Sequence, residues 1–73
     1  MEPGQKYNYN YDMSLNWLLP PQSLVREVVS LFEHDKHGHV VKVLVTRGNE
    51  PQGTRWVRYE RFNEEIEKGL WST

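Results

Sequence analysis

Short apolar runs of β-branched residues, separated by polar turns, dominate the middle of the chain. The segment HVVKVLVTR, residues 39–47, alternates its side chains between two faces and predicts a β-strand. The preceding run LVREVVSLF, residues 24–32, fits either a helical face after a Ser23 cap or a second strand. The strand is favoured because the polar sequence HDKHG, with glycine at the bend, separates the two runs as a hairpin turn does.

A third strand and a helix are predicted beyond this hairpin. The sequence GNEPQG, residues 48–53, indicates a turn, and the following TRWVRYE predicts the third strand. Asn63 is a candidate N-cap and Gly69 a stop residue, which together predict a short helix near 63–69. We expect this helix to cover one side of the sheet through apolar residues at four-residue spacing: Phe62, Ile66 and Leu70.

The N-terminal residues 1–22 form an aromatic arm that Pro20-Pro21 separates from the rest of the chain. Every second residue of the arm would share one face if it were extended: Tyr7, Tyr9, Tyr11, Met13, Leu15 and Trp17. Two outcomes are open: the arm pairs as another strand, or part of it stays mobile until it binds a partner. We favour a division in which Leu15 to Leu19 dock on the domain and residues 1–12 stay loose.

The predicted fold is therefore α+β. It is a three-stranded antiparallel β-meander with a short C-terminal helix, formed by residues 23–73, together with a partly flexible N-terminal arm.

Size and composition limit the functions that such a fold can have. The chain has 73 residues, which suffice for one core but not for a large cleft between layers, so we do not expect an enzyme or a bound cofactor. It contains no cysteine, which suits a reducing cytoplasm. No apolar window reaches the roughly 20 residues of a membrane span, so we expect no membrane contact.

The net charge of −1 conceals a mildly basic middle section between acidic ends. Residues 34–61 contain six basic and three acidic side chains, which is too weak an excess to predict tight nucleic-acid binding. Mixed charge suits a protein partner better. The residues predicted to contact it are aromatic residues of the arm and arginines of the third strand: Tyr7, Tyr9, Tyr11, Trp17, Arg55 and Arg58.

Two other kinds of site remain as alternatives. A small nucleic-acid-binding module could use the sheet face and the arginines of RWVRYERF, although Arg55 and Arg58 point to opposite faces of a strand. A zinc site could form from His34, His37 and His39, but a polar hairpin turn explains the same residues and no metal is expected. Catalysis finds no support, because there is neither a nucleophile elbow nor a phosphate-binding glycine loop.

From its opening, MEPGQKYNYNYDMSLNW, to its ending, EKGLWST, the chain resembles the small RNA-polymerase-binding transcription regulators of Xanthomonas phages. The whole chain, and no single motif, carries this resemblance. It implies a non-enzymatic, cytoplasmic protein, acting as a monomer, that binds the two largest subunits of the host RNA polymerase near the RNA exit channel. It also implies inhibition of promoter-dependent initiation, antitermination, and contact with nascent RNA within the complex.

Overall fold

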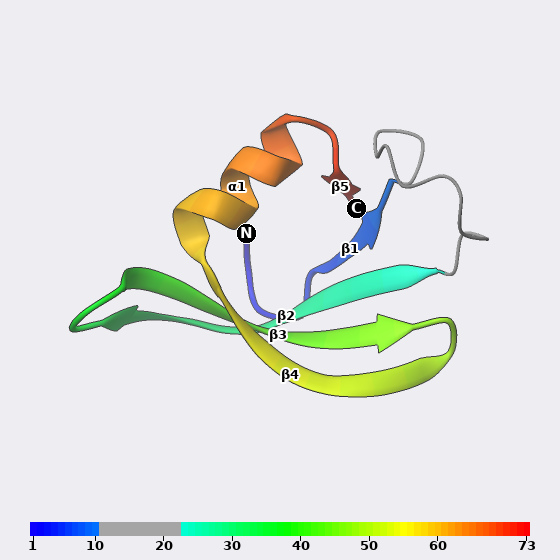
Figure 1. Ribbon diagram of the computed structural model, residues 1–73, viewed down its shortest axis with the longest axis horizontal. Helices are drawn as coiled ribbons and strands as arrows, with labels where there is room; N and C mark the ends of the chain where they lie inside the picture. Colours follow the sequence, from blue (N-terminus) through cyan, green and yellow to red (C-terminus); the bar gives the residue numbers. More distant parts are fainter. Residues whose placement is uncertain (11–22) are drawn as a thin grey trace.

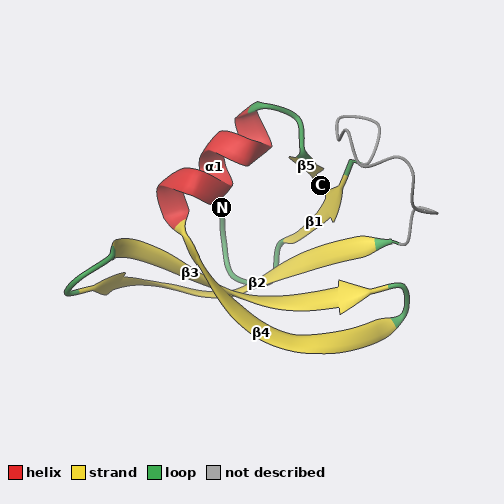
Figure 2. Ribbon diagram, viewed as in Figure 1, coloured by secondary structure: helices red, strands yellow, loops and turns green. Residues whose placement is uncertain are grey.

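The computed structural model describes residues 1–10 and 23–73. Within them, one antiparallel sheet has the strand order β4-β3-β2-β1-β5, and one helix lies over one of its faces (Figures 1 and 2). The elements are β1 Lys6–Tyr9, β2 Leu24–His34, β3 Gly38–Arg47, β4 Glu50–Arg58, α1 Tyr59–Glu67 and β5 Trp71–Ser72. The α+β class is confirmed, but the sheet has five strands where three were predicted.

Strands β2 and β3 form the predicted hairpin. Their partners run from Leu24 opposite Arg47 to His34 opposite Gly38, so the strand interpretation of residues 24–32 is confirmed. Gly38 closes the turn with a φ of 70°, a left-handed conformation that glycine adopts without steric penalty. The tip of this hairpin extends beyond α1 (Figure 1).

A β-bulge in β2 changes which of its side chains face the helix. Val28 and Ser30 lie opposite neighbouring residues of β3, so Val29 between them has no partner. Side chains alternate along a strand, and the extra residue therefore places Phe32 and His34 on the outer face, away from α1.

Residues 1–10 belong to the sheet, so the expectation that residues 1–12 stay loose is wrong for this part of the chain. Strand β1 pairs with β2, and the N–H of Gly4 donates to the carbonyl of Val28 at 2.7 Å. On its other side β1 pairs with β5. The physical reason is that a meander of three strands leaves the backbone groups at the edge of β2 unpaired and part of its apolar face exposed. Strand β1 pairs with this edge, and its side chains cover part of the apolar face.

Helix α1 begins earlier than predicted. It starts at Tyr59, directly after β4, and its N-cap Arg58 makes no side-chain capping bond, so the assignment of Asn63 as the N-cap is wrong. Burial of Phe62 against the sheet outweighs the local capping signal. The predicted end is confirmed: Gly69 has a φ of 84°, and the N–H of Leu70 donates to the carbonyl of Glu65, as in a Schellman motif.

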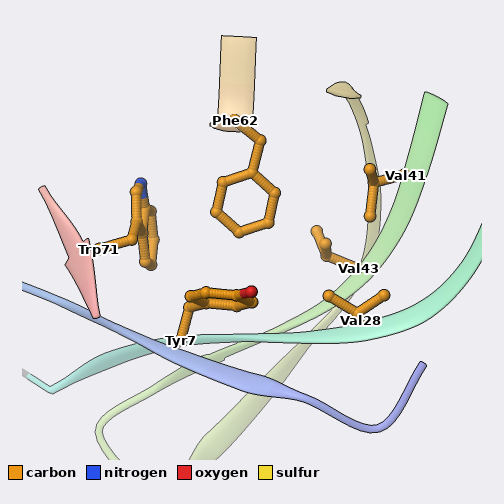
Figure 3. Packing of buried hydrophobic residues seen from close by; sticks show 6 residues of the cluster. All are labelled: Tyr7, Val28, Val41, Val43, Phe62 and Trp71. Atoms are coloured by element: carbon orange, nitrogen blue, oxygen red, sulfur yellow. The ribbon is translucent and has the colours of Figure 1, made fainter. Parts of the chain in front are cut away.

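The core joins both ends of the chain to the middle strands (Figure 3). The ring of Phe62 meets Tyr7 edge to face at 5.3 Å between centroids and Trp71 at 5.7 Å. The remaining buried residues of this cluster are valines of β2 and β3: Val28, Val41 and Val43. Aromatic pairs of this geometry each add about 0.5–1.5 kcal/mol to the free energy of unfolding, beyond the contribution of the apolar area that they bury.

Replacement of Tyr7 by alanine should destabilise the protein strongly. Only 6% of Tyr7 is exposed, and truncation of a buried aromatic residue costs about 3 kcal/mol or more. We expect the midpoint of thermal unfolding, followed by circular dichroism, to fall by roughly 10–20 °C. Tyr7→Phe is the matched control, because it removes only the hydrogen bond from Tyr7 Oη to Gln5 Oε1 at 2.8 Å. A midpoint within a few degrees of the parent would show that Tyr7 is not a core residue.

The same tyrosine should make the fold sensitive to alkali. Burial, with smaller contributions from Tyr59 and Glu2, raises the pKa of Tyr7 above its ordinary value of 10.0. The unfolded chain therefore loses this proton first, and the contribution to stability that is present below about pH 10 declines as the pH rises further. Between pH 9 and 11 the free energy of unfolding of Tyr7→Phe should fall less steeply than that of the parent; identical slopes would contradict the argument.

Candidate functional site

An aromatic cluster occupies the outer face of the sheet near the hairpin tip. It consists of Phe32, His34 and Trp56; the rings of Phe32 and Trp56 meet edge to face at 5.1 Å, and those of His34 and Trp56 lie 6.4 Å apart. Trp56 is 60% exposed, the largest value among the large apolar residues that are exposed in the described part of the chain. The cluster therefore exposes the indole of Trp56 to solvent, while the ring of Phe32 already packs against it.

Strand register and the bulge create this cluster. Trp56 of β4 lies opposite Lys42 of β3. Val40, two residues before Lys42 on the same face, lies between Phe32 of β2 and Arg58 of β4. Val40 is only 4% exposed although it belongs to the outer face, because these larger neighbours surround it. Without the bulge at Val29, the side chain of Phe32 would point to the other face of the sheet.

A small apolar hollow adjoins the cluster. Its volume is about 390 Å³, and Phe32 and Val40 belong to its lining together with Leu31 and Tyr59. A hollow of this kind, next to an exposed tryptophan, can accept an apolar side chain from a partner.

The histidines lie at the hairpin tip, where His34 belongs to the cluster and His37 lies beside it. Nδ1 of His34 accepts a hydrogen bond from the backbone N–H of Lys36 at 3.1 Å, and its ring lies 4.8 Å from that of His37. Within residues 1–10 and 23–73, no three histidine or acidic side chains are grouped so that they could hold a metal ion. The tip therefore has the geometry of a polar turn.

A groove of about 850 Å³ lies between α1 and strands β2, β3 and β4, and it reaches the outer-face residues Trp56 and Arg58 where β4 leads into the helix. All five arginines of the chain line it: Arg26, Arg47, Arg55, Arg58 and Arg61. None of the four lysines, all of them within the described residues, does so. We call this feature the arginine groove. Its apolar lining consists of Leu24, Val45, Val57 and Trp56 of the aromatic cluster, and α1 contributes Glu60, Glu64 and Glu65.

Arg26 is held in place by the core. Its guanidinium lies 4.3 Å from the ring centroid of Trp71 and 5.1 Å from that of Phe62. Nη1 lies 3.6 Å from Glu65 Oε1 and is buried without a hydrogen bond. Burial lowers the pKa of Arg26, and the carboxylate of Glu65 opposes that shift. The same carboxylate accepts a hydrogen bond from Trp71 Nε1 at 3.0 Å. Glu65 therefore connects the helix to the indole of Trp71 and to the guanidinium of Arg26.

Three arginines of the groove have no counter-charge among the described residues. Arg26 and Arg61 both approach Glu65, whereas Arg47, Arg55 and Arg58 have no carboxylate within 4.0 Å in the part of the chain that the structure describes. All three are exposed. The wall formed by β3 and β4 therefore carries unpaired guanidinium groups.

The predicted contact residues are distributed over three different environments. Tyr7 is buried in the core, and Tyr9 packs against Trp71 at 5.0 Å between centroids. Tyr11, Trp17 and the predicted docking segment Leu15 to Leu19 lie outside the described residues. Arg55 and Arg58 do occupy opposite faces of β4, as predicted. They nevertheless border one groove, because the chain turns into α1 directly after Arg58.

The sequence reasoning missed the aromatic cluster and the convergence of the arginines. Regular alternation along the predicted strand would place Phe32 on the same face as Val28, and only the bulge moves it to the other face. The alternation of the third strand does not by itself show that Trp56 is left 60% exposed. One signal was available: all five arginines lie outside the arm, in elements that the predicted fold brings together.

The chain matches no known protein family, curated protein or solved structure. No helix within the described residues is both long enough and apolar enough to cross a membrane. The fold and its surfaces define a small α+β domain with two exposed features, the aromatic cluster and the arginine groove.

The carboxylate of Glu65 should matter more for stability than the arginine that it accompanies. Glu65→Ala leaves Arg26 partly buried without its counter-charge, and we expect a loss of about 2 kcal/mol in denaturant unfolding. Arg26→Met keeps most of the packing volume and should cost about 1 kcal/mol, since Glu65 retains Trp71 and Arg61.

Glu64→Ala is the control for these variants. Glu64 and Lys68 form an exposed ion pair, and its removal should cost less than about 0.5 kcal/mol. Equal effects of Glu64→Ala and Glu65→Ala would contradict the role given to Glu65.

Proposed function

We propose that this protein is a non-enzymatic regulator that binds the RNA polymerase of its host through the aromatic cluster. Bound there, it inhibits promoter-dependent initiation and promotes antitermination. The observation that carries the contact surface is the 60% exposure of Trp56 beside an apolar hollow. A large exposed indole costs solvation in the free protein, and a partner that covers it gains that free energy.

The composition of this surface suits a protein partner. Tryptophan and arginine are the residue types that most often dominate binding energy, and Arg58 lies two residues from Trp56 on the same outer face. The edge-to-face contact between Phe32 and Trp56 restricts the indole before binding, which lowers the entropy lost on association.

The choice of RNA polymerase rests on the resemblance of the whole chain to the phage regulators described above. This resemblance implies contact with the two largest subunits, near the RNA exit channel. A protein of this size can act by adding one rigid surface to a large enzyme, and a high concentration of it compensates for a modest interface. Such a mechanism requires no chemistry from the small protein itself.

Trp56→Ala should weaken binding to the host RNA polymerase by roughly 30-fold, because truncation of a central interface tryptophan costs about 2 kcal/mol. The midpoint of thermal unfolding should change by only a few degrees, since the indole is largely exposed. Surface plasmon resonance against the intact polymerase measures the first quantity, and circular dichroism the second. The variant should lose initiation inhibition and terminator readthrough in the same proportion.

Val29→Ala is the matched control, because Val29 is an exposed apolar residue at the bulge and not part of the cluster. It should bind as the parent does. If Trp56→Ala also binds as the parent does, the contact surface lies elsewhere. If the parent itself does not bind the polymerase, the proposed function fails.

A further inference from the structure

We propose that the arginine groove binds a single-stranded nucleic acid, with Arg47, Arg55 and Arg58 holding its phosphates. This site borders the aromatic cluster at Trp56, which also lines the groove, and it does not depend on the polymerase as partner. The two kinds of basic residue are segregated on the surface: all five arginines line the groove, and all four lysines lie elsewhere.

Such segregation points to a ligand that uses the particular properties of guanidinium. Lysine supplies a point charge, whereas arginine supplies a flat fork that matches the oxygens of a phosphate and a face that stacks on bases. A site that only needed positive charge would accept either residue. A nucleic-acid strand offers both phosphates and flat rings, while an acidic peptide segment offers the anions alone.

The unpaired arginines are too far apart for a single phosphate. Arg58 lies opposite Val40, and Arg47 belongs to the same strand as Val40, seven residues further on. At about 3.3 Å per residue the two arginines are separated by roughly 23 Å along the sheet. Arg55, opposite Val43, lies between them. A stacked strand rises by about 3.4 Å per nucleotide along its axis, so an elongated polyanion of several nucleotides can contact all three arginines.

The rest of the groove is compatible with a nucleic-acid strand. Leu24, Val45 and Val57 provide apolar surface for bases and riboses. The carboxylates on α1 repel phosphates less than their number suggests, because Glu65 is paired with two arginines and Glu64 with Lys68. Glu60 remains as an acceptor for a base amino group.

Charge sets the expected strength of this interaction. The protein has a net charge of −1, so binding should be weak and should depend on the three local contacts. Three neutralised phosphates predict a slope of about −2 for log affinity against log salt concentration, using about −0.7 per contact for single strands.

The test uses the isolated protein and fluorescein-labelled 12-mers of uridine and of thymidine, with fluorescence anisotropy measured at several salt concentrations. The variant Arg47→Gln/Arg55→Gln should lose at least tenfold in affinity and should have a salt slope shallower by about 1.4. Arg47→Lys/Arg55→Lys keeps the charge and should lose severalfold, because the fork geometry is gone. Both positions are exposed, and unchanged thermal midpoints would verify that the variants fold.

The matched control is Lys36→Gln/Lys42→Gln, which removes the same charge outside the groove. It should bind like the parent. A preference for uridine would identify RNA as the source of the phosphates, and equal binding of both 12-mers would assign recognition to the shared backbone; both results support the proposal. Absence of binding by the parent at 50 mM salt, or an equal loss in the lysine control, would overturn it. Displacement of the 12-mer by oligoglutamate at equal charge concentration would reassign the groove to an acidic protein segment.

Discussion

The edge-to-face contacts of Phe62 with Tyr7 and Trp71 join three parts of the chain that are far apart in sequence. Tyr7 comes from β1, Phe62 from α1 and Trp71 from β5, and the valines of the hairpin complete the cluster. A chain of 73 residues has only a small core, so each of these rings contributes a large share of the buried area. The guanidinium of Arg26 against two of the rings extends the same cluster to the base of the arginine groove.

This core also determines what each face of the sheet presents to other molecules. Because the helix packs on one face of the sheet and β1 and β5 extend the sheet beyond β2, the opposite face of β2, β3 and β4 is left without a covering element among the described residues. The bulge at Val29 then adds Phe32 and His34 to that face, beside Trp56. One residue without a partner in the ladder thus changes the chemistry of the surface and not only the course of the strand.

Strand β4 is common to both proposed surfaces. Its alternation directs Trp56 outward and Arg55 toward the helix, so a protein bound to the cluster and a strand bound in the groove would meet along one edge of the sheet. The two surfaces differ in character: one is aromatic with few charges, and the other carries guanidinium groups that have no counter-charge among the described residues. We infer that they are suited to different ligands and can be tested by separate substitutions.

The sequence by itself determined the features that depend on neighbouring residues. Valine content and the HDKHG turn predicted the β2–β3 hairpin, and Gly69 predicted the end of α1, because turn and cap conformations are decided within a few residues. Only the tertiary structure decided the rest: β1 as a strand, the start of α1 at Tyr59, the face of Phe32 and the convergence of five arginines. Of the predicted contact residues, Arg55 and Arg58 lie on exposed surfaces, whereas Tyr7 is buried. The physical reason is that pairing between distant segments, one bulge in register and burial of Phe62 depend on contacts that no local window of sequence contains.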